Sequence, residues 1–186
     1  RCGNRPPCAH LGRRTYLEYH RGTYTSQARN KKNNRKTELK LREAEWLASE
    51  AAVKTGDFSS YPAKDFHEAW KIALRNQFHD IIPGSSIHEV YEDSTEEYRK
   101  ANEILDAIEK NALKVLTRDA ASTVTVVNNS SFAGEGIVTV KGFEDKEGSW
   151  LSTDGKELPA VRTENGWLVK VSRRGAHWLY DSDFQR

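Results

Sequence analysis

Asn76-Gln-Phe-His-Asp-Ile-Ile-Pro-Gly-Ser-Ser86 separates two helical patterns and decides how this chain folds. Before it, apolar residues recur at helical spacing, and Pro83-Gly84 is expected to end that helix. After it, Ser86-Ile-His-Glu89 has the form of a capping box, which predicts the start of the next helix. Because helices joined by short links pack antiparallel, this stretch predicts a helical bundle.

Three amphipathic helices are expected around this stretch. The first is predicted from about Thr25 to Lys54, and Gly56 should end it. Its apolar face comprises Leu39, Leu41, Ala44, Trp46, Leu47 and Ala51. The second should have Pro62 in its first turn and reach Ile81, with a stripe of Phe66, Trp70, Ala73, Leu74 and Phe78. The third should reach about Leu116, with a face of Ile87, Val90, Tyr91, Ser94, Tyr98, Ala101, Leu105, Ile108 and Ala112. We therefore predict an antiparallel three-helix bundle over residues 16–118.

After Arg118 the pattern changes to short β-branched runs. Strands are predicted at 122–127, 136–140 and 167–171, with a weaker one near 158–161. Asp154-Gly155 and Asn165-Gly166 are hairpin signals. So few strands leave open edges, so the sheet is expected to continue beyond this chain. The predicted fold class is α+β: the bundle, then an incomplete antiparallel β-sandwich-like domain over residues 119–186.

Composition limits the class of protein. The 186 residues include five Trp, seven Tyr and six Phe, which is typical of a globular chain. Met is absent even at position 1, so we expect a fragment, a processed chain or a partly read one. No apolar run approaches the roughly 20 residues that span a bilayer. Residues 1–15 are predicted to be an irregular lead; its Cys2, Cys8 and His10 fit no common zinc pattern. So few cysteines favour a reducing compartment, and we predict a cytoplasmic location.

Charge is unevenly distributed along the chain. Residues 1–42 contain twelve Lys or Arg and two acids, whereas the remainder contains seventeen and twenty-five. The basic residues at the start of the first helix are Arg29, Lys31, Lys32, Arg35 and Lys36. They could form a stripe that binds phosphates of a nucleic acid, or an ordinary solvated helix face. The absence of interleaved aromatic residues favours the solvated face.

His79 and Asp80 are the candidate site residues. A carboxylate near a helix C-terminus is disfavoured by the helix dipole by roughly 0.3–1 kcal/mol, and such misplaced residues often mark functional sites. His79 could bind a metal, and Asp80 could bind the metal or a substrate. Alternatively, the dipole favours a histidine here without any metal, and Asp80 simply pairs with it. Spacing leaves both interpretations open. A separate group, His20-Arg21-Gly22 between Tyr19 and Tyr24, could form a pocket wall or only a loop that leads into the first helix, with Tyr24 in the core.

Two segments resemble glycoside hydrolase family 38, the class II α-mannosidases. Residues 17–29, Leu-Glu-Tyr-His-Arg-Gly-Thr-Tyr-Thr-Ser-Gln-Ala-Arg, resemble the family's link from the catalytic domain to the helical middle domain. Residues 74–86 resemble the His-Asp motif of that middle domain. The order of elements also agrees over residues 16–172, whereas residues 1–15 and 173–186 depart from the family pattern.

The resemblance implies retaining hydrolysis of terminal α-mannosides with a bound zinc ion. His79 would be a zinc ligand, and Asp80 would bind substrate hydroxyls. The catalytic nucleophile and the other metal ligands would lie on an N-terminal α/β domain that this sequence lacks. The implied partners are α-mannoside glycans, that domain and the remaining β strands, with no nucleic acid and no membrane. The fragment alone would then be inactive. The alternatives are a basic helical nucleic-acid-binding module and a non-catalytic interaction fragment.

Overall fold

A computed structural model describes residues 21–117, 122–129, 132, 134–173 and 178–185. Side chains are described up to residue 172. The predicted irregular lead, with Cys2, Cys8 and His10, lies outside the described residues, as do Tyr19 and His20. The domain limits at 16–118 and 119–186 stay predictions.

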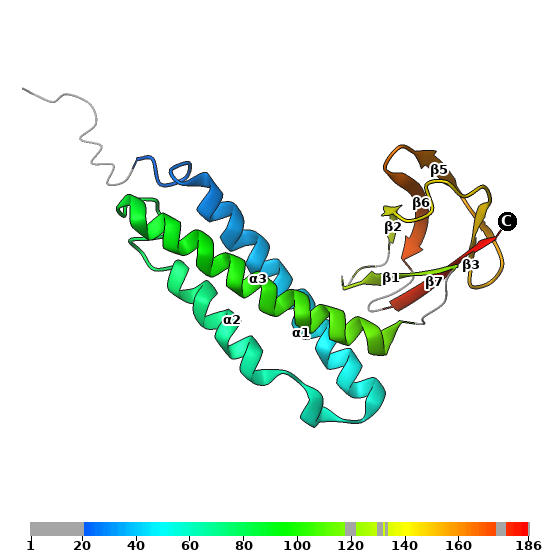
Figure 1. Ribbon diagram of the computed structural model, residues 1–186, viewed down its shortest axis with the longest axis horizontal. Helices are drawn as coiled ribbons and strands as arrows, with labels where there is room; N and C mark the ends of the chain where they lie inside the picture. Colours follow the sequence, from blue (N-terminus) through cyan, green and yellow to red (C-terminus); the bar gives the residue numbers. More distant parts are fainter. Residues whose placement is uncertain (1–20, 118–121, 130–131, 133, 174–177, 186) are drawn as a thin grey trace, which may run out of the picture.

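The first half of the chain is helical. Its elements are α1 (Ala28–Thr55), the short 3₁₀ helix η1 (Phe58–Ser60), α2 (Ala63–Asn76) and α3 (His88–Leu116). Successive helices run in opposite directions, and α1 and α3 lie side by side along most of their length (Figure 1). As predicted, Gly56 ends α1 in the left-handed conformation, with φ 72°. The first helix begins at Ala28 rather than Thr25, and Gln27 precedes it with a positive φ of 50°.

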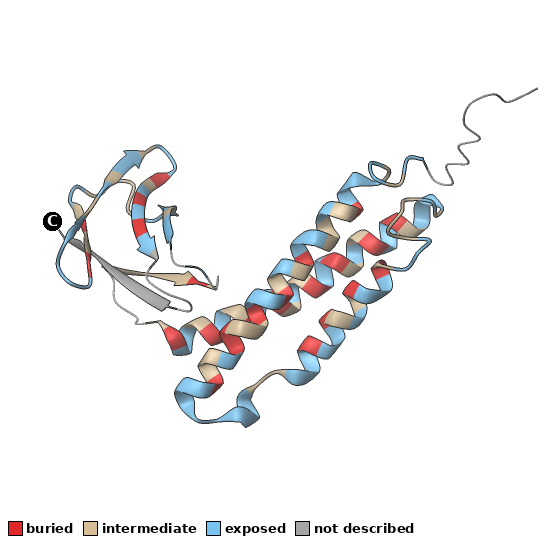
Figure 2. Ribbon diagram, turned by 180° about the vertical axis from the view of Figure 1, so that it is seen from behind, coloured by how far each residue is buried: buried red, intermediate tan, exposed pale blue. Residues whose placement is uncertain are grey.

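All three helices contribute to one apolar core. Its buried members are Leu41, Ala44 and Ala48 of α1, Phe66, Ala69 and Ala73 of α2, and Leu105 and Ile108 of α3. The many alanines let the helix backbones approach closely. On α3 every predicted face residue from Tyr91 to Ala112 is buried, and only Ile87 (68% exposed) and the half-buried Val90 lie outside the core. Buried residues line the facing sides of the helices (Figure 2). The periodicity of α3 therefore predicted its packing.

The predicted end of the second helix and parts of the predicted apolar faces were wrong. The second helix ends at Asn76, not Ile81, and Leu74 and Phe78 are 57% and 51% exposed. The reason is a contact from another helix: the buried Asn76 amide donates to Glu97 Oε2 of α3 at 2.7 Å, which fixes the chain direction there. Leu39 is also 46% exposed. Leu74 therefore lies on the outer side of α2, and Phe78 lies in the turn beyond its end.

The capping box at Ser86 does not form. The third helix begins at His88, and its N-cap Ile87 has no side-chain cap. Instead, the Ser86 hydroxyl donates to the backbone oxygen of Asp80, and the Ser86 amide donates to the Tyr91 hydroxyl at 3.0 Å. The Ser86 side chain is therefore bonded to the preceding turn and does not cap the helix.

The second half consists of two antiparallel sheets. One has the order β1 (Thr123–Asn128), β7 (Trp178–Gln185), β3 (Ser149–Ser152) and β4 (Glu157–Leu158). The other has the order β2 (Gly134–Val140), β6 (Gly166–Arg173) and β5 (Ala160–Thr163). Helices followed by antiparallel sheets confirm the α+β fold class. The predicted continuation of the sheet beyond this chain stays a prediction.

The sequence located most of the strands but not β3 or β7. The weak strand predicted near 158–161 is divided at Pro159, and its two parts join different sheets. Both signals mark hairpins: Asp154-Gly155 lies between β3 and β4, and Asn165-Gly166 lies where the chain turns from β5 into β6, whose first residue is Gly166. Gly166 is required at its position, since an added Cβ would lie 2.2 Å from the Val140 oxygen.

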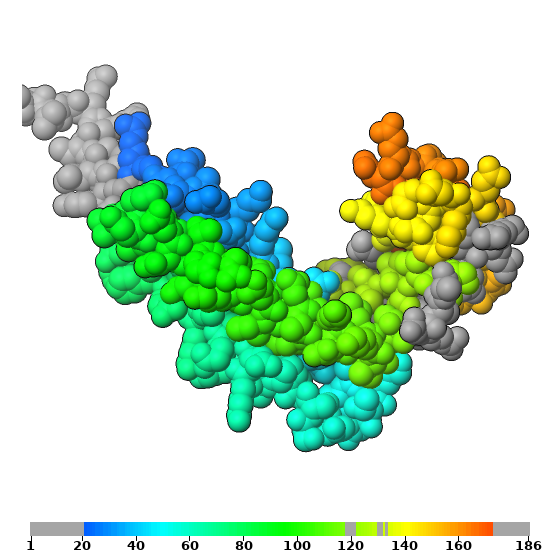
Figure 3. All heavy atoms as spheres, in the orientation of Figure 1, coloured from blue at the N-terminus to red at the C-terminus, as the bar shows by residue number. Residues whose placement is uncertain are grey.

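The two halves meet at a small apolar junction. Leu47 of α1 and Ala112 and Leu116 of α3 are buried there, and Val127 of β1 packs against them. The Lys54 ammonium closes the end of α3 by donating to the Val115 oxygen at 2.9 Å. In the space-filling view the helices and the strands form two lobes joined at this place (Figure 3). The α2–α3 turn lies at the opposite end of the helical lobe (Figure 1).

Candidate functional site

His79 and Asp80 lie in the turn that joins α2 to α3. The turn is compact, because the Ile81 and Ile82 amides both donate to the Phe78 oxygen, at 2.8 and 3.0 Å. The side chains of the pair are 77% and 63% exposed, and His79 Nε2 lies 3.5 Å from Asp80 Oδ2. The Phe78 ring lies beside the imidazole, with centroids 4.1 Å apart. The turn therefore displays an imidazole and a carboxylate together on the surface.

Contrary to the sequence prediction, Asp80 does not lie near the C-terminus of a helix. Because α2 ends at Asn76, Asp80 lies four residues beyond the helix. The dipole effect falls off within the last turn of a helix, so Asp80 is not disfavoured in the way that the sequence suggested. What remains unusual is the exposure of the pair on a turn whose backbone is tightly held.

Lys31 of α1 binds the backbone of the α2–α3 turn. Its ammonium donates to the backbone oxygens of Ile82 at 2.9 Å, Pro83 at 3.3 Å and Ser26 at 2.5 Å. Burial lowers the pKa of the Lys31 ammonium. This residue therefore does not belong to an exposed basic stripe, as the sequence suggested, but connects the start of α1 to the α2–α3 turn.

Further polar contacts bind the same turn. The buried Asn30 amide donates to the Ile81 oxygen at 3.5 Å, and its oxygen accepts from the Ser94 hydroxyl at 2.7 Å. The Tyr91 hydroxyl also donates to the Ile81 oxygen, at 3.3 Å. Because these donors come from α1 and α3, both long helices position the turn.

A second polar network lies under the end of α2. The Gln77 amide donates to Glu38 Oε1 at 2.8 Å and to Asn34 Oδ1 at 3.0 Å. Tyr98 donates to the same Asn34 oxygen at 3.2 Å. Burial, and then the carboxylates of Glu38 and Glu97, raise the pKa of the Tyr98 hydroxyl far above its ordinary value. The end of α2 is thus fixed by directional bonds rather than by apolar packing.

The pair offers part of a metal site. An imidazole nitrogen and a carboxylate oxygen are both zinc ligands, but a catalytic zinc usually has three protein ligands. Within the part of the chain that the structure describes, no three His, Cys, Asp or Glu side chains are grouped to hold a metal. His79 as a metal ligand and Asp80 as a substrate ligand therefore stay predictions.

The other candidates from the sequence have different outcomes. Tyr24 is 92% exposed, so its predicted place in the core was wrong. Of the basic residues on α1, Arg29, Lys32 and Lys36 are exposed, and Arg35 lies 3.5 Å from Glu38. No described helix is long and apolar enough to cross a bilayer.

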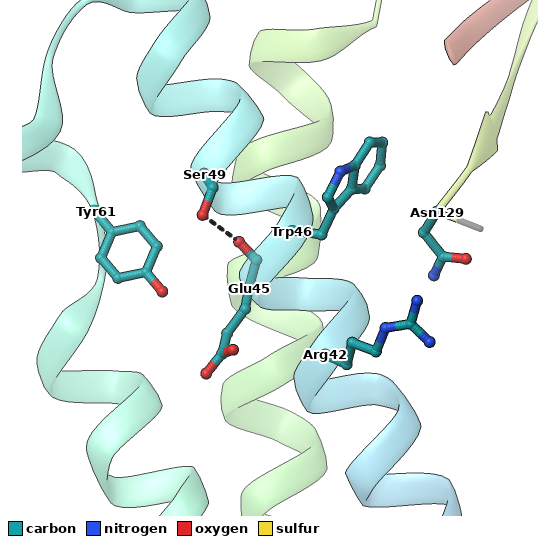
Figure 4. A pocket seen from close by; sticks show the side chains of 6 residues that line it. All are labelled: Arg42, Glu45, Trp46, Ser49, Tyr61 and Asn129. Carbon is teal, nitrogen blue, oxygen red and sulfur yellow. Dashed lines mark hydrogen bonds between the residues drawn. The ribbon is translucent and has the colours of Figure 1, made fainter. Parts of the chain in front are cut away.

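A shallow groove of about 350 Å³ lies along α1, near the opposite end of α2. It is lined by Arg42, Glu45, Trp46, Ser49, Tyr61 and Asn129. Tyr61 and Asn129 stand on either side of α1, and the Arg42 side chain extends toward Asn129 (Figure 4). Glu45 accepts a hydrogen bond from Trp70 Nε1 at 2.6 Å. The groove contains none of the site residues predicted from the sequence.

Comparison with known families gives one decisive match. Residues 18–116, which contain all three helices and the His79–Asp80 turn, match the alpha mannosidase middle domain. This chain belongs to that family. The match supports the resemblance to glycoside hydrolase family 38 and ends where the last helix ends.

Relatives of this middle domain are parts of much larger proteins. The chain is 50% identical to an alpha-mannosidase of Saccharomyces cerevisiae over 76 residues, 41% of this chain and 7% of the yeast protein. It is 43% identical over 83 residues to alpha-mannosidase 2C1 of Mus musculus, 45% of this chain and 8% of the mouse protein. A crystal structure of an alpha-mannosidase from Enterococcus faecalis has the same fold, with TM-score 0.70 and 20% identity over 89% of this chain and 24% of the bacterial one.

Sequence reasoning missed the residues that hold the middle-domain turn. Asn30, which binds the turn, is buried, and so is Thr37, which accepts from the Asn102 amide of α3; both continue the Leu41–Ala44 stripe of α1 toward its start at helical spacing. That spacing was a usable signal, because polar residues on the buried face of a helix usually have a partner. Lys31 gave no local signal, since two of its acceptors lie 51 and 52 residues away.

Proposed function

We propose that this chain is the middle-domain part of a zinc-dependent retaining α-mannosidase that removes terminal α-D-mannose from glycans. The observation that carries the proposal is the exposed His79–Asp80 pair, on a tightly held turn, inside the segment that matches the alpha mannosidase middle domain. The names of the relatives support the same enzyme class. The chain would supply one wall of the site.

His79 is proposed as the zinc ligand of this chain. Its imidazole is exposed, so the ring can reach a metal whose other ligands lie outside this chain. Asp80, with Oδ2 3.5 Å from the imidazole, would accept hydrogen bonds from sugar hydroxyls beside the metal. A bound zinc would act as a Lewis acid and orient the sugar.

The remaining parts of the reaction are proposed to lie outside this chain. Retaining hydrolysis needs a carboxylate nucleophile and a second carboxyl group as acid and base, about 5–5.5 Å apart. We assign neither to these 186 residues, so the chain alone should be inactive. The proposed partners are α-mannoside glycans, an N-terminal catalytic domain and further β strands, with no nucleic acid and no membrane, in a cytoplasmic enzyme.

Replacing His79 with alanine in the intact polypeptide tests the metal assignment. Zinc retained after dialysis should fall by about tenfold or more, because even outer-shell partners of a metal ligand typically contribute 10–100-fold in affinity. Metal analysis per mole of folded protein measures this directly. His88→Ala is the matched control, since His88 is also exposed and its Nε2 lies 3.4 Å from a carboxylate oxygen, that of Glu92. An unchanged zinc-to-protein ratio in His79→Ala would contradict the proposed ligand role.

A further inference from the structure

We propose that Lys31 is the positioning residue of the His79–Asp80 site: its ammonium clamps the α2–α3 turn onto the start of α1. This inference rests on the proposed function for its catalytic consequence but not for its structural part. A lysine in a basic run would ordinarily be a solvated residue of a helix face. Lys31 is instead half-buried and directed at backbone oxygens.

The contacts of Lys31 use its whole donor capacity. A lysine ammonium has three donors, and three oxygens receive them, at 2.5 Å (Ser26), 2.9 Å (Ile82) and 3.3 Å (Pro83). The oxygens belong to two segments that are far apart in sequence. Removing the ammonium would leave these carbonyl groups partly buried without their charged donor, which is costlier than losing a neutral bond.

A close backbone contact strengthens the same clamp. Gly84 has φ +90°, and a Cβ added there would lie 2.7 Å from Ser26 Cβ. The turn therefore packs directly on the residues that lead into α1. Lys31 then binds both packed segments, so that the turn and the chain entering α1 form one unit.

The clamp acts on the pair through the backbone of the turn, because the side chains of the pair are themselves exposed. Lys31, Asn30, Tyr91 and Ser86 all bind backbone oxygens between residues 80 and 83. The His79 and Asp80 side chains are exposed, and within the described part of the chain they lie beside each other and beside Phe78. Their direction therefore follows the backbone of the turn. An error of about 1 Å in such a group can cost about 100-fold in rate.

Hydrogen exchange on the 186-residue chain tests the clamp without metal or sugar. Three amides report on the turn: Ile81 and Ile82, which donate to the Phe78 oxygen, and Gly84, which donates to the Ile81 oxygen at 3.1 Å. In Lys31→Met their exchange should accelerate about tenfold or more, because a charge-assisted anchor is lost. Lys32→Met, on the exposed neighbour, is the matched control and should leave these rates unchanged.

Two results would overturn the clamp. One is unchanged exchange of the three amides in Lys31→Met. The other is an equal acceleration along α1, α2 and α3, which would make Lys31 a general stability residue. If Lys31→Met does not fold by circular dichroism, Lys31→Gln replaces it. Its uncharged amide should produce the same local pattern at smaller amplitude, and the same two results would overturn the proposal.

Kinetics of the intact polypeptide test the catalytic consequence. At saturating zinc, Lys31→Met should lower kcat/KM for an aryl α-mannoside about tenfold or more per mole of folded enzyme, because Asp80 is displaced. A residue that only stabilised the fold would leave this ratio unchanged. The two proposals fail separately: retained zinc in His79→Ala contradicts the metal role, whereas unchanged turn exchange contradicts the clamp.

Discussion

The two halves of the helical lobe are held by different chemistry, although α1 and α3 run through both. Toward the α2–α3 turn, the core includes every buried polar residue described on the helices: Asn30, Thr37, Asn76 and Ser94. Toward the strands, the core is formed by alanine, leucine, isoleucine and phenylalanine, such as Ala48, Phe66 and Ile108. Apolar packing stabilises without specifying direction, whereas hydrogen bonds fix orientation. In the half that carries the proposed site, hydrogen bonds therefore fix how the helices and the turn are oriented.

The apolar half should carry most of the folding stability. Leu105 is fully buried between the helices, so Leu105→Ala should lower the free energy of unfolding by about 2–5 kcal/mol. Urea unfolding followed by circular dichroism measures the change. Val115→Ala, at a position that is 37% exposed on the same helix, is the control and should cost much less. A comparable loss in the two variants would show that burial between the helices does not carry the stability of the apolar half.

Local patterns predicted the buried faces of the helices well and the polar contacts between helices poorly. The α3 stripe from Tyr91 to Ala112 is a property of neighbouring residues, so periodicity predicted it. The end of α2 depends instead on Asn76 meeting Glu97 of another helix. Similarly, the sequence predicts that Ser86 caps a helix, but its hydroxyl donates to the Asp80 oxygen instead. His79 and Asp80 could be predicted as a pair because they are adjacent in sequence. Most of the residues that hold their turn are distant in sequence, so local patterns did not predict them.

A substitution in the α2–α3 turn should have the next largest effect on the free energy of unfolding. Gly84→Ala combines a positive φ of 90° with a Cβ only 2.7 Å from Ser26 Cβ, and it should cost about 1–3 kcal/mol. Gly56→Ala is the matched control: φ is +72°, but an added Cβ there meets nothing within 4 Å. The difference between the two unfolding free energies isolates the contact with Ser26. Equal costs would show that the turn does not pack tightly on the start of α1.

The smallest expected effect concerns the polar network and its dependence on pH. Tyr98→Phe removes the bond to Asn34 Oδ1 and should cost about 1 kcal/mol near neutral pH. Tyr24→Phe, at a position that is 92% exposed, should cost nothing measurable. Because burial raises the pKa of Tyr98 in the folded state, the unfolded chain loses this proton first as the pH rises.

The stability that Tyr98 contributes is therefore complete below the unfolded pKa of about 10 and declines above it. Unfolding free energies measured by urea denaturation between neutral pH and pH 11 should fall less steeply in Tyr98→Phe than in the unmodified chain. Parallel slopes for the two proteins would mean that the Tyr98 hydroxyl ionises as easily in the folded chain as in the unfolded one. In that case water would reach the polar network in the half that carries His79 and Asp80. The hydrogen bonds to Asn34 from Gln77 and Tyr98 imply that this network is closed to water.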